Sequence, residues 1–344
     1  MTKGEQVMSK RFFLIVFCFL VAGVGTMSDV RPAVAQQVVN FRLDFRLSGY
    51  HLPFYWAKVK GYYEQNGLTV NIKEGSGSGQ TVNLVAAKEA DIGLADFMLM
   101  ANGVSKGMQI KGVYGLLQKN PWAVISYQDA AIKTPKELEG HSVAVIADHK
   151  ALLELLLKKN DVPIDKMTVR VVNVATRNTV FAEGKVDSFV SVSIGSPTDL
   201  VVRAQQGKGK PLHFLHFADF GVAPLGQGLL VHTDYLVKNA ETIRKFIAAS
   251  NKAIAEVSKP ENLEEALDIA LKETGASAER RASLRQQWQD ATPTFQTANS
   301  KGHPFGWMSD KDWQETTKIL QATGYVAKAP PAADLYTNDL IPKD

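Results

Sequence analysis

The sequence of 344 residues has a single cysteine, Cys18, which lies among the first 35 residues. A chain with one thiol forms no internal disulfide, and thiolate-bound metal centres need several cysteines. The spacings of phosphate-binding loops, dinucleotide-binding loops and His-Glu-x-x-His zinc sites are also missing. The one Gly-x-Ser-x-Gly match, at residues 75–79, is too rich in Gly and Ser for a nucleophile elbow. We therefore expect no catalytic residues, no metal and no cofactor.

An excess of one charge is nearly absent, because 39 basic residues oppose 35 acidic ones and leave a net charge of +4. The basic residues are scattered among the acidic ones and form no stripe with interleaved aromatic residues. Proteins that bind nucleic acid usually carry such a stripe. We therefore do not expect nucleic acid as a partner.

A long apolar run occurs only near the start, at residues 12–24, directly after Lys10 and Arg11. The run is shorter than the ~20 residues that span a bilayer, and the small residues 33–35 suit a signal peptidase. Residues 1–35 are therefore predicted to be a secretory signal peptide, cleaved after Ala35, which places the mature protein in the periplasm. A membrane anchor is the alternative.

The 309 residues that follow the predicted signal peptide exceed the usual size of one hydrophobic core. Short apolar segments alternate with helical patterns, which predicts an α/β fold with two lobes, each a mostly parallel sheet flanked by helices. Lobe I is assigned to residues 36–120 and 223–344 and lobe II to residues 121–222, and the two crossings between them allow hinge closure. Strands are predicted at residues 41–47, 69–72, 92–94, 110–116, 123–127, 142–146, 168–172, 188–192, 213–217 and 228–232.

Candidate site residues in the first half of the chain lie in loops that follow predicted strands, because ligands bind beyond the carboxyl ends of parallel strands. Tyr50, His51 and Phe54 predict an aromatic wall with polar tips, and ordinary core packing is the alternative. Asp96 ends a strand and is expected to accept hydrogen bonds from a ligand, to cap the next helix, or both. Trp122 at the first crossing is expected to stack on a planar ligand or to pack between the lobes.

The Gly-Ser loop at residues 75–79 precedes a predicted helix. Its N–H groups and the positive helix end favour an oxyanion or a carbonyl, and a flexible connector is the alternative. The candidate ligand contacts in this loop are Ser76, Gly77 and Ser78.

Candidate site residues of lobe II also lie between a predicted strand and a helix. Arg177 is the residue that we expect to pair with an anionic ligand group, since a guanidinium fork fits carboxylates. A solvated arginine at a helix start is the alternative. The other candidates in lobe II are His149, Asn178, Ser193 and Ser196.

The chain resembles the periplasmic solute-binding proteins of the nitrate, sulfonate, taurine and thiamin-pyrimidine precursor group (NMT1/THI5-like). The resemblance runs from about residue 41 to residue 257. Its most specific segments are Tyr50-His51-x-Pro53, Ala57-Lys58-x-Lys60-Gly61-Tyr62-Tyr63-x-x-x-Gly67-Leu68, Ala90-Asp91-Ile92-Gly93, Glu137-Leu138-x-Gly140 and Glu183-Gly184-Lys185-Val186-Asp187.

This resemblance implies a type II periplasmic binding protein fold, whose two lobes close on a small solute. It also implies delivery of the solute to an inner-membrane ABC permease and its ATPase, or alternatively to a sensor, and we expect a monomer. Asp44, Asp96 and His51 in one cleft would repel a simple anion and favour a ligand with N–H groups. We therefore expect a planar or amphoteric, pyrimidine-like solute, with a sulfonate or nitrate as the second choice.

Fungal thiamin-pyrimidine synthases, which use pyridoxal phosphate, look similar over the same stretch. Where such an enzyme has its cofactor-binding lysine this chain has Ala95, and where it has its donor histidine this chain has Leu99. The cysteine-rich motif of those enzymes is absent as well. The sequence therefore predicts a binding protein and keeps the enzyme as the competing hypothesis.

Overall fold

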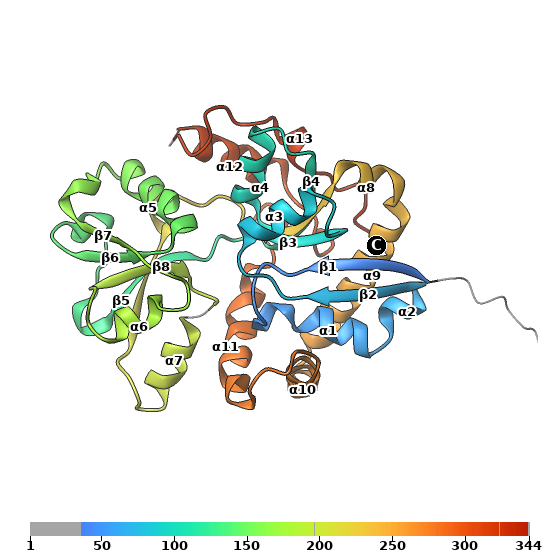
Figure 1. The fold of residues 1–344 in the computed structure, drawn as a ribbon, viewed down its shortest axis with the longest axis horizontal. Coiled ribbons are helices and arrows are strands. Elements are labelled where there is room, and N and C mark those ends of the chain that lie inside the picture. The colour runs from blue at the N-terminus through green and yellow to red at the C-terminus, as the bar shows by residue number, and fades with distance from the viewer. Residues whose placement is uncertain (1–35, 196, 323, 343–344) are drawn as a thin grey trace, which may run out of the picture. The chain divides into compact units, whose positions relative to one another are not determined.

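The structure is a computed structural model that describes residues 36–195, 197–322 and 324–342. The predicted signal peptide lies outside these residues. Two five-stranded sheets form the centres of two lobes (Figure 1), and ten strands occur in the described ranges.

The first sheet has the strand order β2-β1-β3-β10-β4. β1 is parallel to β2 and β3, while β10 is antiparallel to both β3 and β4, so four strands run one way and β10 runs against them. The strands are β1 (Gln37–Arg42), β2 (Leu68–Lys73), β3 (Ile92–Asp96), β4 (Ile110–Leu117) and β10 (Gln227–His232).

The second sheet has the strand order β7-β6-β8-β5-β9, and only β5 runs against its neighbours. Its strands are β5 (Trp122–Tyr127), β6 (Ser142–Val145), β7 (Thr168–Val171), β8 (Ser188–Val192) and β9 (Leu212–His216). Both sheets are thus mixed but mostly parallel in direction, and the predicted α/β fold is confirmed.

Nine of the predicted strands overlap the observed ones closely, whereas the first, predicted at residues 41–47, lies at Gln37–Arg42. Val39 and Phe41 point into the core and pair with β2, which fixes the register of β1. After Leu43 the chain leaves the sheet and continues as an irregular loop. The prediction was wrong here because the loop residues are as apolar as a strand.

The helices cover the faces of both sheets (Figure 1). A ring cluster of Phe41, Phe54, Tyr63 and Phe246 joins the first sheet to the long helix α9, with ring centroids 4.9 Å apart for Phe41–Phe54 and 5.1 Å for Phe41–Phe246. The helices are α1 (Leu52–Val59), α2 (Tyr62–Gln65), α3 (Ser78–Ala86), α4 (Phe97–Ser105), α5 (Ala147–Lys159), α6 (Arg177–Ala182), α7 (Thr198–Gln205), α8 (Thr233–Lys238), α9 (Ala240–Val257), α10 (Leu263–Thr274), α11 (Arg281–Ala291), α12 (Asp310–Ala322) and α13 (Ala332–Leu335).

The chain passes between the two sheets at residues 118–121 and again at residues 217–226. The two crossings touch, since the Gly226 N–H lies 3.4 Å from the Gln118 carbonyl oxygen. The Gln118 side-chain amide donates to the carbonyls of Phe295 and Trp307, which ties the first crossing to the C-terminal segment. The lobe boundaries at residues 120/121 and 222/223 remain a prediction that this connectivity supports.

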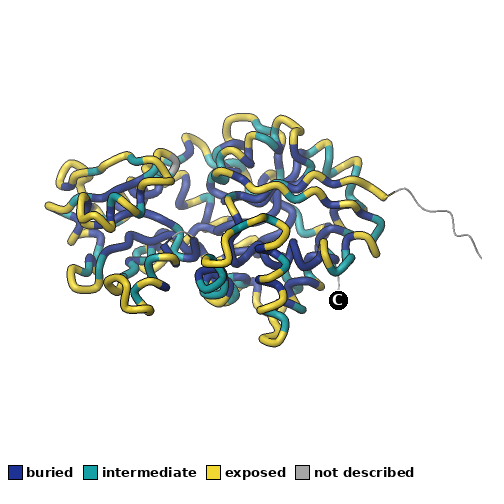
Figure 2. Tube along the Cα trace, turned by 60° about the horizontal axis from the view of Figure 1, so that its bottom comes forward, coloured by how far each residue is buried: buried dark blue, intermediate teal, exposed yellow. Residues whose placement is uncertain are grey.

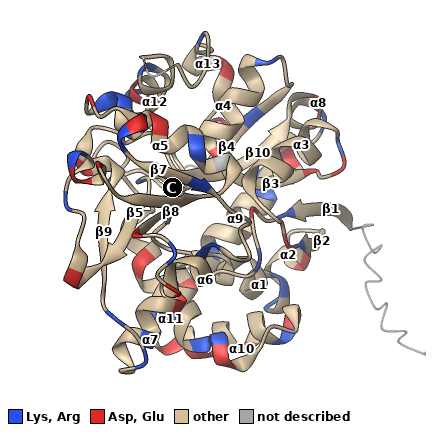
Figure 3. Cartoon of the chain, turned by 60° about the vertical axis from the view of Figure 1, so that its left-hand side comes forward, with Lys and Arg blue, Asp and Glu red and all other residues tan. Residues whose placement is uncertain are grey.

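Buried residues lie mainly in the interior of each lobe and exposed residues lie mainly on its outside (Figure 2). Basic and acidic residues are interspersed along the helices, as in α10 and α11 (Figure 3). Among the described residues, no helix is both long and apolar enough to cross a membrane.

Candidate functional site

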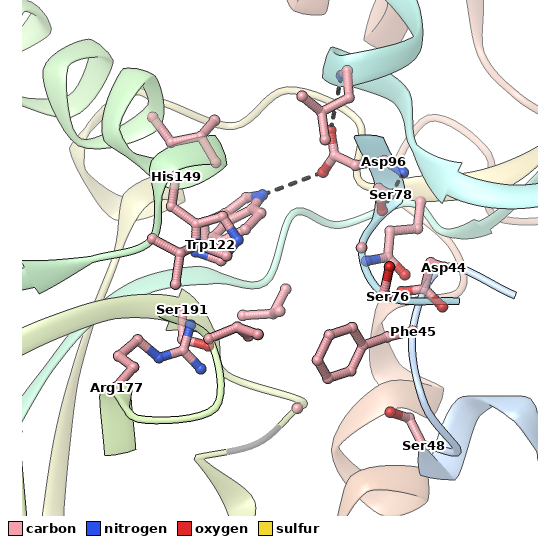
Figure 4. Close-up of a pocket in the computed structure, with 18 of the residues that line it drawn as sticks. Asp44, Phe45, Ser48, Ser76, Ser78, Asp96, Trp122, His149, Arg177 and Ser191 are labelled. Carbon is pink, nitrogen blue, oxygen red and sulfur yellow. Dashed lines mark hydrogen bonds between the residues drawn. The ribbon is translucent and has the colours of Figure 1, made fainter. Parts of the chain in front are cut away.

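A cavity of about 100 Å³ is lined by residues of both sheets' loops. Since one water molecule needs ~10–15 Å³ of such space, the cavity accommodates several waters or one small organic molecule. Figure 4 shows Asp44, Phe45, Ser76, Ser78 and Asp96 from the first lobe facing side chains of the second lobe. The second lobe contributes Trp122, Ile146, His149, Leu152, Val174, Arg177, Ser191, Val192 and Gly195.

Asp44 is buried in the loop after β1 and accepts two side-chain hydrogen bonds. The Tyr50 hydroxyl donates to Oδ2 at 2.9 Å, and His51 Nε2 lies 2.8 Å from Oδ1. The Ser48 backbone N–H donates to His51 Nδ1, which therefore carries no proton. His51 is thus a neutral imidazole whose Nε2–H donates to Asp44, as both oxygens of a carboxylate accept.

Tyr50 connects this carboxylate to the cavity surface. Burial, and then the charge of Asp44, raise the pKa of the Tyr50 phenol well above its usual value, so the hydroxyl keeps its proton. The side chains of Ser48 and Gln227 act in the opposite direction and lower this pKa. Gln227 Oε1 is buried and has no hydrogen-bond partner among the described residues.

Asp96 closes the same wall at the end of β3. Its Oδ1 accepts from the N–H groups of Met98 and Leu99, so it caps α4, and its Oδ2 accepts from the Trp122 indole N–H at 3.3 Å. Burial raises the pKa of Asp96 to about 6, although these hydrogen bonds oppose the shift. The sequence left capping and ligand contact as compatible roles, and Asp96 both caps the helix and lines the cavity.

His149 faces Trp122 edge-on across the second wall, with ring centroids 4.4 Å apart and an interplanar angle of 76°. Burial, and then the nearby Arg177 charge, lower the pKa of His149 to about 3, so the ring is neutral at physiological pH. The Val190 backbone opposes this shift. Nδ1 is buried and finds no partner in the described parts of the chain, and it accepts or donates a hydrogen bond according to the ring tautomer.

Arg177 begins α6 and is only 2% exposed. Its guanidinium donates to the Val190 carbonyl at 3.3 Å and lies over the Phe189 ring, with Cζ 5.3 Å from the ring centroid. Burial lowers the pKa of Arg177 to about 10, which still leaves it protonated at neutral pH. The second wall therefore carries a buried positive charge next to two neutral rings.

The Gly-Ser loop lies at the cavity, and two of its N–H groups are engaged within the protein. The Gly75 and Gly77 N–H groups donate to the Phe45 and Asp44 carbonyls, at 3.1 and 2.8 Å. A Cβ at Gly75 would lie 2.2 Å from the Leu43 carbonyl oxygen, so only glycine fits there. Two of the N–H groups thus hold the loop of Asp44 in place and are not available to an anion.

Nine predicted site residues line the cavity, and four others lie elsewhere. His51 is fully buried behind Asp44, and Phe54 packs in the core between Phe41 and Phe246 because its helix turns it inward. Asn178 lies beside Arg177, and Ser193 bonds through its backbone N–H to Pro121. Ser196 lies outside the described residues. The nine are Asp44, Tyr50, Ser76, Gly77, Ser78, Asp96, Trp122, His149 and Arg177.

Several lining residues were missed from the sequence. Gln227 opens β10, and Ser191 lies within β8, so neither occupies the loop after a strand where candidates were sought. Tyr325 comes from the segment after α12, for which no sequence pattern predicted a site. The remaining missed residues are Phe45, Ser48, Leu99, Ile146, Leu152, Val174, Val192 and Gly195.

No group of three or more His, Cys, Asp or Glu side chains is placed to hold a metal ion in residues 36–195, 197–322 and 324–342. The arrangement offers hydrogen-bonding groups from both walls, one buried cation and an indole surface. Such a set can bind and orient a small polar molecule.

Residues 48–262 match the family model described as NMT1/THI5 like. The riboflavin-binding protein RibY of Chloroflexus aurantiacus is 24% identical over 84% of this chain and 82% of its own length. The 4-amino-5-hydroxymethyl-2-methylpyrimidine phosphate synthase THI13 of Saccharomyces cerevisiae is 26% identical over 62% of this chain. The match covers 65% of that synthase, which is less than two thirds of its length.

Among solved structures, the alkanesulfonate-binding protein SsuA of Xanthomonas axonopodis pv. citri superposes with a TM-score of 0.65. The superposition covers 88% of this chain and 99% of that one, at 14% sequence identity. At this identity the likeness concerns the fold alone, and it confirms the two-lobed fold that the resemblance predicts.

Proposed function

Because this chain belongs to the NMT1/THI5-like family, we propose that it is the periplasmic solute-binding component of an ABC importer. It captures a small organic solute between its lobes by hinge closure and delivers it to the permease and ATPase in the inner membrane. The observation that carries this proposal is the cavity, whose two walls come from different sheets and bring buried polar groups to one space. The alternative partner is a sensor, which would bind the protein once the protein holds its solute.

The solute class follows from the polar atoms of the cavity. Gln227 Oε1, an acceptor, and His149 Nδ1 are buried on opposite walls without a partner among the described residues, and leaving either unpaired costs about 1–3 kcal/mol. A solute with an N–H group toward Gln227 satisfies that acceptor, and nitrate or a sulfonate does not, since these anions only accept. We therefore favour a planar, pyrimidine-like or amphoteric molecule whose rings stack near Trp122.

Arg177 completes this description. Its buried guanidinium favours an anionic or strongly polar end on the solute, since charge-assisted bonds are about twice as strong as neutral ones. Asp44 accepts hydrogen bonds from Tyr50 and His51, and these bonds hold the first wall in shape. A solute with N–H donors at one end and an anionic group at the other suits both walls.

The competing function is a thiamin-pyrimidine synthase that uses pyridoxal phosphate, as the similarity to the yeast enzyme suggests. Leu99 lines the cavity and Ala95 is fully buried in β3. An alkyl side chain at either position supplies neither an amine for the cofactor nor an imidazole for the reaction. This chemistry supports the binding role over the enzyme.

A thermal-shift screen of protein purified after expression of the full chain tests the proposal. The panel contains aminopyrimidines, flavins, aromatic acids, amino acids, nitrate and alkanesulfonates. A bound solute at 100 times its dissociation constant adds about 2.7 kcal/mol to stability, and we expect this from a planar compound with N–H groups. A rise with nitrate or sulfonates alone would overturn the solute class. Formation of a pyrimidine product from added pyridoxal phosphate would overturn the non-enzymatic role.

A further inference from the structure

Gln287 on α11 joins the two lobes directly behind the cavity. Its Oε1 accepts from the Gly49 N–H at 2.8 Å, and its Nε2 donates to the Gly195 carbonyl at 2.9 Å. Gly49 belongs to the segment of Ser48 and Tyr50 in the first wall, whereas Gly195 lies in the second wall. We propose that Gln287 is a positioning residue that fastens the two walls together in the geometry that grips a solute. This inference rests on the proposed function, because it concerns the closed form of the same cavity.

The surroundings of Gln287 favour a fastening role over a chance contact. The side chain is only 2% exposed, so both of its hydrogen bonds are sheltered from water. Ile194, next to Gly195, is buried in the core cluster of the first lobe together with Leu284 and Trp288 of α11. The loop after β8 therefore inserts an apolar residue and a backbone acceptor against the same helix.

The first-lobe side of this junction is rigid. A Cβ at Gly49 would lie 2.4 Å from both the Leu284 carbonyl oxygen and the Trp288 nitrogen, so the backbone of the short helix Gly49–His51 rests directly on α11. Arg285 of α11 pairs with Glu264 of α10, at 2.8 Å from Nη2 to Oε2. These contacts keep α11 with the first lobe, as Figure 1 shows it beside α10.

The contact between Gln287 and the second lobe is consequently the one that a hinge motion breaks. Movement of the second lobe away from α11 leaves the Gly49 bond intact and separates Gln287 Nε2 from the Gly195 carbonyl. Only an amide carries an acceptor for one wall and a donor for the other on a side chain of this length. A carboxylate in its place keeps the first bond and puts a negative oxygen against the Gly195 carbonyl.

Energy transfer between the lobes tests this proposal without any ligand. Glu64 and Lys208 are exposed, one on each lobe, and Cys18 is the only native cysteine. The full chain with Cys18→Ser, Glu64→Cys and Lys208→Cys therefore carries two dyes at defined sites. We expect Gln287→Glu to lower the ratio of closed to open molecules about tenfold, since a buried hydrogen bond becomes a repulsive contact. The control is Gln289→Glu, an exposed change on the same helix, which should leave the distribution as in the wild type.

Amide exchange provides a second readout that a merely structural role would not give. The Gly49 N–H should stay protected in Gln287→Glu, which keeps the acceptor, and exchange faster in Gln287→Met, which lacks it. If Gln287→Glu fails to fold, Gln287→Met carries the energy-transfer comparison instead. Transfer distributions that match the wild type in the Gln287 variants would overturn the proposal. A Gln287 effect in a chain that binds none of the panel compounds would count against the importer function and leave the fastening role standing.

Discussion

Asp44 organises the first wall of the cavity through its two donors, Tyr50 and His51. The His51 tautomer is fixed by the Ser48 N–H, so each group in this chain of hydrogen bonds has one role. Fully satisfied networks of this kind hold a polar wall rigid in a low-dielectric site. The groups left over at its surface, among them Gln227 Oε1, are the ones a solute meets.

Asp96 is the titrating residue of this site, and its effect on stability has a definite sign. Its pKa of about 6 in the folded protein compares with ~3.9 in an unfolded chain. Between these values the folded state keeps a proton that the unfolded state has lost, so the free energy of unfolding falls as pH rises from about 4 to 6. Since each pKa unit corresponds to ~1.36 kcal/mol, Asp96 changes the free energy of unfolding by roughly 2–3 kcal/mol over this pH range.

Urea unfolding of the wild type and of Asp96→Asn at pH 4, 5, 6 and 7 measures this contribution. Asparagine caps a helix about as well as aspartate, so the variant keeps the start of α4 and removes the ionisation. We expect the difference in stability between the two proteins to shift in favour of the variant as the pH rises to 6. A difference that stays constant over this range would contradict the raised pKa.

At this scale the sequence pointed to cavity-lining residues at the ends of elements: Asp96 at the end of a strand, Trp122 at the first crossing and Arg177 at the start of a helix. It did not identify Gln227 or Ser191, because their side chains reach the cavity from within strands whose neighbours are unknown before folding. Phe54 was expected in the cavity and instead packs in the core. Whether an aromatic residue in a helix faces the ligand or the core depends on how the helix is rotated about its axis. The more apolar face of the helix packs on the core.

Among the elements, α11 contacts both lobes through Gln287. Gly49→Ala tests how closely the neighbouring short helix packs on it. The added Cβ meets backbone atoms at 2.4 Å, which cannot rotate away, so we expect a loss of at least about 1–3 kcal/mol. Gly209→Ala is the matched control, because its nearest atom lies at 3.7 Å, and its effect should stay within about 0.5 kcal/mol.

The denaturant midpoints of the two glycine variants show whether the short helix Gly49–His51 packs tightly on α11. A Gly49→Ala protein as stable as Gly209→Ala would mean that α11 is free to move away from the first lobe. The fastening role of Gln287 would then lose its fixed side.

Element positions were predictable where burial imposes a period on the sequence. The buried positions of α9, including Ile243, Phe246, Ile247 and Ile254, recur every three or four residues, as expected of a helix with one buried face. By contrast, α11 has the polar sequence RASLRQQWQDA and was not predicted as a bridge. Its buried Gln287 is paired with residues 238 and 92 positions away, and no local pattern reports such contacts.

The whole molecule derives its cleft from the two crossings. β5 and β10 each follow a crossing, lie between two other strands of their sheet, and run against them. Each sheet thus contains one strand that the chain enters directly after a crossing. A hinge at the two crossings lets the sheets rotate relative to each other while each core stays intact. The alternation of strands and helices in the sequence predicted two such lobes. It did not predict which side chains face each other across the cavity, because these come from segments far apart in the sequence.

Calorimetric titration of the solute found by the thermal-shift screen tests most directly whether both lobes hold it. The wild type should bind one molecule per chain. Gln227→Met in the first wall and Arg177→Met in the second should each weaken binding by about tenfold or more, since each removes a buried partner worth at least ~1.4 kcal/mol. The control Gln289→Met should bind as the wild type does. Undiminished affinity in either wall variant would contradict capture between the lobes, because the solute would then be held by one lobe alone.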